Sequence, residues 1–225
     1  MIGEARTRQY EQLDLERKLV VVFDICSSTS ILEDLKQTDN IHKWRDLLIR
    51  LKEDLLAESS RLHMQLYKFI GDGWILLFPA DISSDQLLDF LSHLSMLFDV
   101  QFDSQIYPVL QRTPIPIGLT FGIDAGELVR LEMKDQTEYV GRALNVASRL
   151  QSATRELPGD AGYRALFAKH AYNSLPPPFP ADREQRAKVV PLPLRNLGGT
   201  GILAVHSHGQ DVRAVPKRVI NALPT

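Results

Sequence analysis

Hydrophobic and polar positions alternate in blocks along the chain, and these blocks predict a series of strands and helices. Residues 19–23, LVVVF, form a continuous run rich in β-branched residues, which is typical of a strand buried on both faces. Hydrophobic residues then recur at helical spacing over 41–55 and again over 87–98, which predicts two amphipathic helices. A short helix is expected directly after the first strand, with Ser30 and Glu33 as its capping box.

A β-hairpin is predicted between the two amphipathic helices. Residues 65–70 alternate, GDG at 71–73 is typical of a tight turn, and 74–78 form a second buried run. The later part of the chain predicts a strand over 117–123, its hairpin partner over 127–131, a helix over 143–150 and a strand over 202–205. This order indicates an α+β fold with a ferredoxin-like βαββαβ core, whose mostly antiparallel sheet is flanked by helices, rather than a doubly wound parallel sheet.

Three stretches differ from this alternating body and set its expected boundaries. Residues 1–17 are polar and predict an N-terminal arm or short helix. Residues 174–193 include six prolines, and because proline lacks an amide proton they predict a loop. Residues 208–225 form a tail with little apolar pattern. The body, 18–207, is expected to form one domain.

Composition narrows the class of protein. The 26 Lys and Arg residues nearly balance 28 Asp and Glu residues, so we expect neither a nucleic-acid nor an anionic-membrane surface. Cys26 is the single cysteine, which excludes an intrachain disulfide and a cysteine-based zinc site and suits the reducing cytoplasm. The start is charged and no run approaches the roughly 18 apolar residues of a membrane span, so we expect no secretion and no membrane insertion.

The first candidate chemistry is a pair of aspartates that follow buried runs. Asp24 ends the first strand just before a serine-rich turn into a helix, where backbone amides attract phosphate. Taken alone, Asp24 is more readily explained as a helix cap. Asp72 lies in the predicted hairpin turn, which a sheet would bring beside that strand. Two carboxylates and the carbonyl of Ile25 are the hard oxygen ligands that Mg²⁺ or Mn²⁺ prefers.

A second candidate group lies on the helix predicted over 143–150. Asn145 and Arg149 are four residues apart and so share one helix face, where an amide can hold a sugar oxygen and a guanidinium a phosphoryl group. Two solvated polar residues are the simpler interpretation of this pair in isolation. The residues expected to face the core are Ala143, Val146, Ala147 and Leu150.

Four segments in this order, VVFDICSST, YKFIGDGWILLF, FGIDAGELV and EYVGRALNVASRL, resemble the signature segments of the class III nucleotidyl cyclases. This family comprises the catalytic domains of adenylate and guanylate cyclases. The resemblance implies the class III cyclase fold and an enzyme that converts a nucleoside triphosphate into a 3′,5′-cyclic nucleotide and pyrophosphate, with two Mg²⁺ or Mn²⁺ ions per site. It also implies a homodimer with two shared active sites, because the family's metal aspartates and its base-binding residues come from different subunits.

The resemblance also assigns roles to individual residues. Asp24 and Asp72 match the metal-binding aspartates, and Ile25 matches the residue whose backbone carbonyl joins them. Asn145 matches the asparagine that orients the ribose, and Arg149 the arginine that stabilises the transition state. The other implied substrate-binding residues are Lys68 and Glu138 for the base, Arg195 for the triphosphate, and Ser27, Ser28 and Thr29 in the turn after the first strand.

The base pocket departs from the family pattern. Adenylate cyclases usually pair the lysine with Asp or Thr, whereas this chain has the longer Glu138; guanylate cyclases usually have Glu at the position of Lys68. A lysine donates and a carboxylate accepts, which suits adenine N1 and N6, uracil O4 and N3, or cytosine N3 and N4. The longer side chain favours a single-ring base. A shift of one residue in this charged hairpin would instead place Thr137 or Tyr139 in the pocket.

The compact chain also resembles the stand-alone pyrimidine cyclases of the Pycsar anti-phage system, so we expect a cyclic pyrimidine nucleotide, with cyclic UMP favoured over cyclic CMP. An adenylate cyclase making cyclic AMP is the first alternative. A cyclase-like module that binds nucleotide without turnover is the second, and the presence of both aspartates, Asn145 and Arg149 speaks against it.

Overall fold

The hydrophobic run at 19–23 lies in strand β1 (Leu15–Ile25), which is buried inside the sheet as its sequence predicts. The structure is a computed structural model that describes residues 13–114, 116–154, 163–176, 187–191 and 202–206. Its strands form one eight-stranded sheet in the order β2-β3-β1-β4-β6-β8-β7, with β5 paired to β4. The remaining strands are β2 (Gln65–Phe69), β3 (Gly73–Pro79), β4 (Leu119–Met133), β5 (Gln136–Val140), β6 (Tyr163–Ala168), β7 (Ala187–Pro191) and β8 (Ile202–His206).

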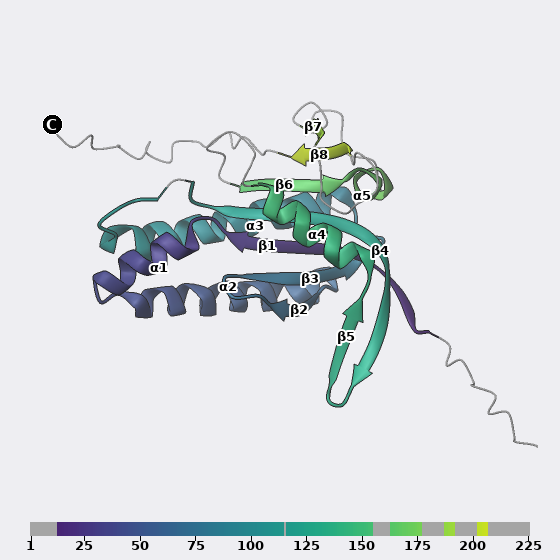
Figure 1. Ribbon diagram of the computed structural model, residues 1–225, viewed down its shortest axis with the longest axis horizontal. Helices are drawn as coiled ribbons and strands as arrows, with labels where there is room; N and C mark the ends of the chain where they lie inside the picture. Colours follow the sequence, from purple (N-terminus) through teal and green to yellow (C-terminus); the bar gives the residue numbers. More distant parts are fainter. Residues whose placement is uncertain (1–12, 115, 155–162, 177–186, 192–201, 207–225) are drawn as a thin grey trace, which may run out of the picture.

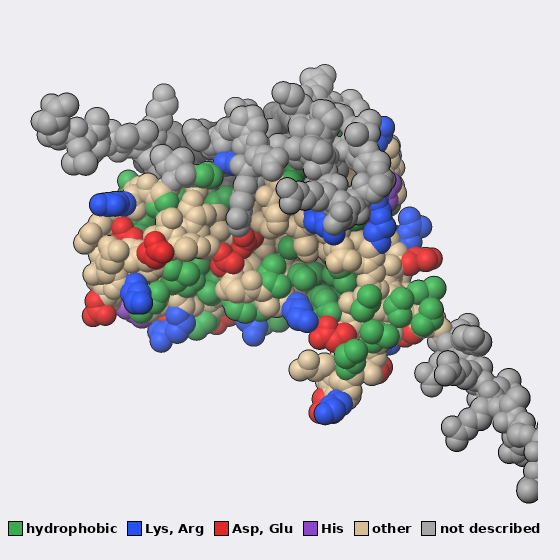
Figure 2. Space-filling view, in the orientation of Figure 1, with side chains coloured by type: hydrophobic (Ala, Val, Ile, Leu, Met, Phe, Trp, Pro, Cys, Tyr) green, Lys and Arg blue, Asp and Glu red, His purple; other side chains and the backbone are tan. Residues whose placement is uncertain are grey.

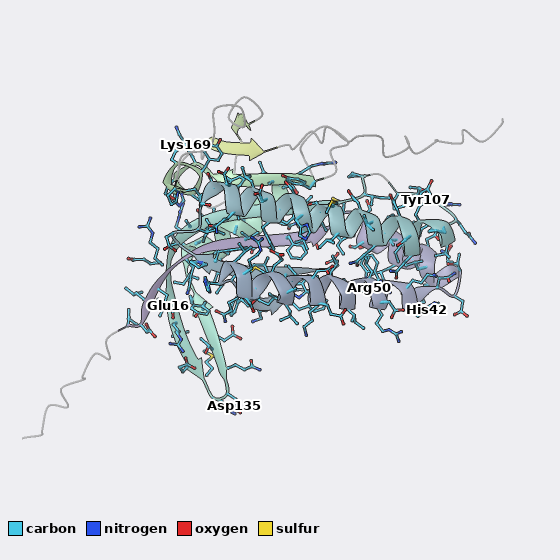
Figure 3. All side chains as sticks on the ribbon, turned by 180° about the vertical axis from the view of Figure 1, so that it is seen from behind. Glu16, His42, Arg50, Tyr107, Asp135 and Lys169 are labelled. Atoms are coloured by element: carbon cyan, nitrogen blue, oxygen red, sulfur yellow. The ribbon has the colours of Figure 1, made fainter. Side chains whose placement is uncertain are left out.

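Helices cover both faces of the sheet (Figure 1). Their bounds are α1 (Ser28–Gln37), α2 (Ile41–Leu62), α3 (Ser84–Gln101), α4 (Arg142–Ala153) and α5 (Lys169–Ser174), and α3 continues into a π-helical turn (Phe102–Ile106) and a 3₁₀ turn (Tyr107–Val109). The long helices α2 and α3 lie on one face, which is the near side in Figure 3, and α4 lies on the other.

Two apolar clusters follow from this arrangement. The larger joins β1 residues such as Phe23 to α2 and α3, where Leu51 and Phe90 are fully buried. The smaller lies under α4, where Val22 packs with Leu128 and Ala147. Successive side chains of a strand point to opposite faces, so one continuous run, LVVVF, supplies both clusters.

The pairing of the strands confirms the expected α+β class. All strand pairs in the described ranges are antiparallel except β4 with β6, which run parallel. The expected helices over 41–55, 87–98 and 143–150 correspond to α2, α3 and α4, and the hairpin at Gly71 to Gly73 joins β2 to β3.

One prediction about the sheet was wrong. Residues 117–123 and 127–131 were expected to be the two strands of a hairpin, but they belong to the single strand β4. The reason is β1, which pairs with β4 continuously from Leu15 opposite Val129 to Ile25 opposite Leu119. Partners on β1 keep the intervening residues extended, and the true hairpin partner is β5. The β4–β5 hairpin projects from the body, with Asp135 at its tip (Figure 3).

The predicted capping box at Ser30 and Glu33 was also wrong. Helix α1 begins earlier, at Ser28, and its N-cap residue Ser27 makes no side-chain cap, because its Oγ donates instead to the carbonyl of Pro116 at 2.8 Å. A capping box does occur at the start of α3, where Ser83 and Gln86 satisfy each other's backbone amides.

The boundaries of the body need two corrections. Strand β1 begins at Leu15, inside the expected N-terminal arm. The proline-rich stretch 174–193, expected to be a loop throughout, contains strand β7, which pairs with β8 and ends at Pro191. The late strand expected over 202–205 is β8. The expected tail, 208–225, lies outside the described residues.

Candidate active site

A pocket of about 330 Å³ opens at the end of β1, where the chain turns into α1. It is lined by Asp24, by residues at the start of α1 and by Arg164 of β6, which are residue types that can bind a metal ion and phosphate. Its lining residues are Asp24, Ile25, Cys26, Ser27, Ser28, Thr29, Pro116, Thr120 and Arg164.

Helix α4 and strand β4 hold Asp24 in place. The side-chain amide of Gln151 donates to Asp24 Oδ2 at 3.4 Å and to Thr120 Oγ1 at 2.9 Å. The hydroxyl of Thr120 in turn donates to the backbone carbonyl of Asp24 at 3.2 Å. The aspartate therefore has a fixed orientation at the strand end instead of acting as a helix cap.

The turn between β1 and α1 brings backbone amides to the same pocket. Ser27 adopts a left-handed conformation with φ of 57°, and the amide of Cys26 donates to the carbonyl of Gly118 at 2.9 Å. The helical bond from Ile31 N to Ser27 O follows, so the amides of Ser28 and Thr29 precede it, at the positions from which helix N-termini bind phosphate.

Asp72 lies in the turn between β2 and β3, as expected. The turn closes with a hydrogen bond from Ile70 N to Gly73 O at 2.9 Å, and Gly71 has φ of 105°. Gly73 pairs directly with Asp24, and a Cβ on Gly73 would lie 1.9 Å from the carbonyl oxygen of Phe23. Only glycine allows this approach, which places Asp72 one residue from the strand partner of Asp24.

The expected base-recognising pair is in contact. Lys68 Nζ lies 3.4 Å from both carboxylate oxygens of Glu138, which joins β2 to β5. The adjacent residue Thr137 turns away and donates to Glu132 of β4. The structure therefore brings Glu138, rather than Thr137, to the lysine.

Tyr67 organises this pair from the neighbouring position on β2. Its hydroxyl accepts the backbone N–H of Tyr139 at 2.9 Å, so its own proton is directed to Glu138 Oε2, at 2.5 Å. The two tyrosine rings meet edge to face at 5.4 Å. The hydrogen bond from Tyr67 and the nearby Lys68 lower the pKa of Glu138, while burial and the Glu138 carboxylate raise the pKa of Tyr67. The lowered pKa favours the ionised carboxylate of Glu138, which can only accept hydrogen bonds.

Helix α4 presents its two candidate residues as predicted. Asn145 is exposed and Arg149 half-buried, whereas Ala143, Val146, Ala147, Leu150 and Gln151 are buried. Neither Asn145 nor Arg149 lines the pocket of Asp24, and neither do Lys68 and Glu138. Within one chain, the candidate residues therefore form separate groups.

Arg164 is a pocket residue that sequence reasoning missed. It lies on β6, its side chain is buried to 8% exposure, and its guanidinium donates to the carbonyl of Thr154 at 3.4 Å. The available signal was a single arginine in the otherwise apolar run YRALFA at 163–168, which was not predicted as a strand. Arg195, which the resemblance favoured for the triphosphate, lies outside the described residues.

The donor set fits a divalent ion held jointly with a nucleotide. Asp24 and Ile25 line the pocket, and Asp72 lies in the adjacent turn. The described ranges contain no group of three or more His, Cys, Asp or Glu side chains that would bind a metal unaided. Two carboxylates and a carbonyl suit Mg²⁺ or Mn²⁺, whose remaining positions phosphate oxygens can fill.

No protein-family model and no curated protein matches the sequence. Solved structures do match the fold. The guanylyl cyclase Cya2 has a TM-score of 0.64 and 17% identity over 89% of this chain and 97% of its own. The adenylyl cyclase CyaB from P. aeruginosa has a TM-score of 0.54 and 18% identity over 86% and 94%. The guanylate cyclase domain of RhGC from Catenaria anguillulae has a TM-score of 0.52 and 18% identity over 85% and 96%.

These neighbours share the mixed sheet, with its helices on both faces, over most of both chains. Across the part of the chain that the structure describes, no helix combines the length and apolar character that a membrane crossing requires.

The similarity to these three solved structures shows that the chain has the fold of the class III adenylyl and guanylyl cyclase catalytic domains.

Proposed function

We propose that this protein is a metal-dependent nucleotidyl cyclase that converts a nucleoside triphosphate into a 3′,5′-cyclic nucleotide and pyrophosphate. The observation that carries the proposal is the pocket at the end of β1, which combines Asp24, the start of α1 and the buried Arg164 on a cyclase fold. An acidic group beside phosphate-binding groups suits a triphosphate bound together with divalent cations.

The residues at the end of β1 and in the adjacent turn hold the metal ions and the phosphates in the proposed reaction. Asp24, the carbonyl of Ile25 and Asp72 would hold two Mg²⁺ or Mn²⁺ ions, which when bound lower the pKa of the attacking 3′-hydroxyl and neutralise the triphosphate. Arg164 and the amides of Ser28 and Thr29 bind phosphate oxygens.

Two residues of α4 act on the ribose and the reacting phosphorus. Asn145 orients the ribose for in-line attack. Arg149 offsets the negative charge that builds on the α-phosphorus, and such a preorganised donor is typically worth about 3–4 kcal/mol.

The active enzyme is a homodimer with two shared sites. Support comes from the separation of the candidate residues, since the pocket of Asp24 contains neither the base-recognising pair nor the two residues of α4. Hydrophobic side chains also gather over the β4–β5 hairpin (Figure 2). Leu15, Met133 and Val140 are 52%, 56% and 56% exposed there, an apolar surface that a second copy would cover.

The favoured substrate is a pyrimidine nucleotide, UTP before CTP. The support is Glu138, which Tyr67 holds against Lys68, and which is one methylene longer than the aspartate common in adenylate cyclases. On the Pycsar resemblance, the cyclic nucleotide would serve as a second messenger of anti-phage defence in the cytoplasm. An adenylate cyclase is the second candidate, because adenine N1 and N6 also complement a lysine and a glutamate.

Incubation of the purified chain with Mn²⁺ and each of the four ribonucleoside triphosphates, with products identified by mass spectrometry, tests activity and base choice together. We expect cyclic UMP or cyclic CMP as the main product. Cyclic AMP as the main product would show that the protein is an adenylate cyclase instead. No product from any of the four would support a nucleotide-binding module instead.

The role of Glu138 is tested separately. Glu138→Asp and Glu138→Thr widen the pocket and should weaken the preference for a pyrimidine by about 10–200-fold, the usual effect of a methylene-sized change. Lys68→Ala should lower activity with every base, because it removes the shared donor. An unchanged base preference in both Glu138 variants would remove this residue from the base pocket.

A further inference from the structure

A buried carboxylate lies beneath the start of α4, away from the pocket of Asp24. Asp124 of β4 is 0% exposed, and its Oδ1 accepts the amide of Ala125 at 2.9 Å. His170 of α5 lies with Nε2 2.8 Å from Asp124 Oδ1 and 3.0 Å from the carbonyl of Ala125. Both neighbours are acceptors, so Nε2 carries the proton. Arg142, the first residue of α4, approaches the other oxygen, Oδ2, at 3.9 Å.

The carboxyl group at this buried position is not explained by packing. Oδ2 has no hydrogen-bond partner among the described residues, and burial raises the pKa of this carboxyl while His170 and Arg142 oppose that rise. Its partner across β1 is Val20, which is apolar, so the described charged groups that face it are His170 and Arg142, both more than half exposed. A neutral residue would fill this position at less free-energy cost.

The first turn of helix α4 has no side-chain cap of its own. The helix begins at Arg142 after the N-cap residue Gly141, and its first turn contains no acidic residue, while Arg142 places a positive charge there. A cation at a helix N-terminus is unfavourable, and a carboxylate beside it offsets that effect. The other end of α4 is held by Gln151, which bonds to Asp24 and Thr120.

Between these two ends the helix rests on the sheet with little clearance. A Cβ on Gly122 would lie 2.0 Å from the carbonyl of Ala147 and 2.2 Å from the amide of Gln151. Gly122 thus acts as the contact point on which α4 crosses β4. The buried side chains of Ala143 and Ala147 pack against the sheet on the same face of the helix, so polar contacts at the ends of α4 act together with this packing in setting the positions of Asn145 and Arg149.

We propose that Asp124 is a positioning residue, which ties Arg142 of α4 and His170 of α5 to the sheet and thereby sets the orientation of the helix that carries Asn145 and Arg149. This inference rests on the proposed cyclase function for its catalytic consequence, but the tether itself is a property of the folded chain. It also links α4 to α5, which directly follows the strand of Arg164.

The first test is Asp124→Asn, which keeps the shape and removes the charge. We expect kcat to fall about 10–100-fold, as for a small misplacement of catalytic groups, with KM for the triphosphate changed less than about threefold. Stability against denaturant should be unchanged or higher, since a buried charge is removed. Arg142→Gln should change kcat and KM in the same direction as Asp124→Asn. His170→Gln, which retains a donor, should keep more activity than His170→Ala.

Hydrogen exchange of the backbone amides of α4 provides the readout that does not depend on activity. Exchange over residues 142–147 should be faster in Asp124→Asn than in the wild type, whereas exchange in α3 should not change. The matched control is Asp46→Asn, which alters an exposed carboxylate of α2 and should leave both measurements unaltered.

Each outcome decides a different claim. Wild-type kcat and wild-type exchange in Asp124→Asn would overturn the tether, and so would a loss of activity explained by a matching loss of folded protein. A wild-type chain that makes no cyclic nucleotide would overturn the proposed function, while the exchange measurement would still support or reject the tether.

Discussion

Tyr67 and Glu138 are joined by a hydrogen bond of 2.5 Å although 71 residues separate them in the sequence. The bond has a fixed direction, because the tyrosine oxygen already accepts the backbone N–H of Tyr139. Glu138 is therefore held with one oxygen bonded to Tyr67 and both oxygens near Lys68. Under the proposed function, in which Lys68 and Glu138 recognise the base, Tyr67 therefore contributes to base choice by orienting Glu138.

The first prediction concerns Tyr67→Phe. Removing the hydroxyl takes away the main cause of the lowered pKa of Glu138, so that pKa rises toward its ordinary value. A lowered pKa keeps the carboxylate charged to a lower pH, so the acidic limb of kcat/KM should move to higher pH in the variant. The pyrimidine preference should also weaken. Profiles of kcat/KM between about pH 4 and pH 8, measured with UTP, CTP and ATP, check both effects. An unmoved acidic limb would show that Glu138 does not titrate in catalysis.

The second prediction concerns the metal ligands. Asp24→Ala and Asp72→Asn should each reduce cyclisation by at least about 100-fold, because each removes an oxygen ligand from the ions that stabilise the reacting phosphates. Binding of Mn²⁺ in the presence of a non-hydrolysable triphosphate, followed by electron paramagnetic resonance, should weaken in parallel. Asp46→Asn on α2 serves as the control. Wild-type manganese binding in both variants would remove these residues from the metal site.

The third prediction tests the shared active site. Asp72→Asn and Arg149→Ala should each be inactive alone, yet their mixture should recover activity. If the two residues enter one site from different subunits, each mixed dimer retains one intact site. Subunit exchange has to be shown first, with differently tagged chains. Mixed dimers that form and remain inactive would contradict the shared-site arrangement.

The fourth prediction concerns the hairpin of Asp72. Gly73→Ala would place a methyl group against the backbone of Phe23, and it should destabilise the protein by roughly 1–3 kcal/mol or more and reduce activity. Gly126→Ala is the matched control, because its new methyl would lie 3.4 Å from the Cβ of Ala143, an ordinary contact. Denaturant midpoints for the two variants check the difference. Equal midpoints would mean that the hairpin can move away from β1 at little cost.

Local patterns predicted the helices α2, α3 and α4 and the inner strand β1, because the spacing of hydrophobic residues in each of them matches the face that it buries. The short helix α5 was not predicted. The local patterns failed at β4, where DAG at 124–126 resembles a turn and is held extended only by its partners on β1. Long-range pairing of that kind leaves no local signal.

The candidate site shows the same difference between residues that the sequence indicates and contacts that only the folded chain creates. The contact of Lys68 with Glu138 followed from the family resemblance, whereas Arg164 was missed because its strand was missed. The contact of Asp124 with His170 joins residues that are 46 positions apart in the sequence, and neither residue signals the other there.

The pairing of β1 with β4 has a consequence for the synthesis of the chain. Leu15 pairs with Val129 and Ile25 with Leu119, so the two strands can begin to pair only after the 93 residues between Ile25 and Leu119 have been made. Until then β1, whose residues 19–23 are all buried in the folded protein, has one edge without a partner, a state prone to pairing with other chains. Contacts of such long range also slow folding. The nascent chain is therefore expected to need a chaperone at this stage, and a ribosome-bound fragment ending before residue 119 should aggregate far more readily than one that includes the whole of β4.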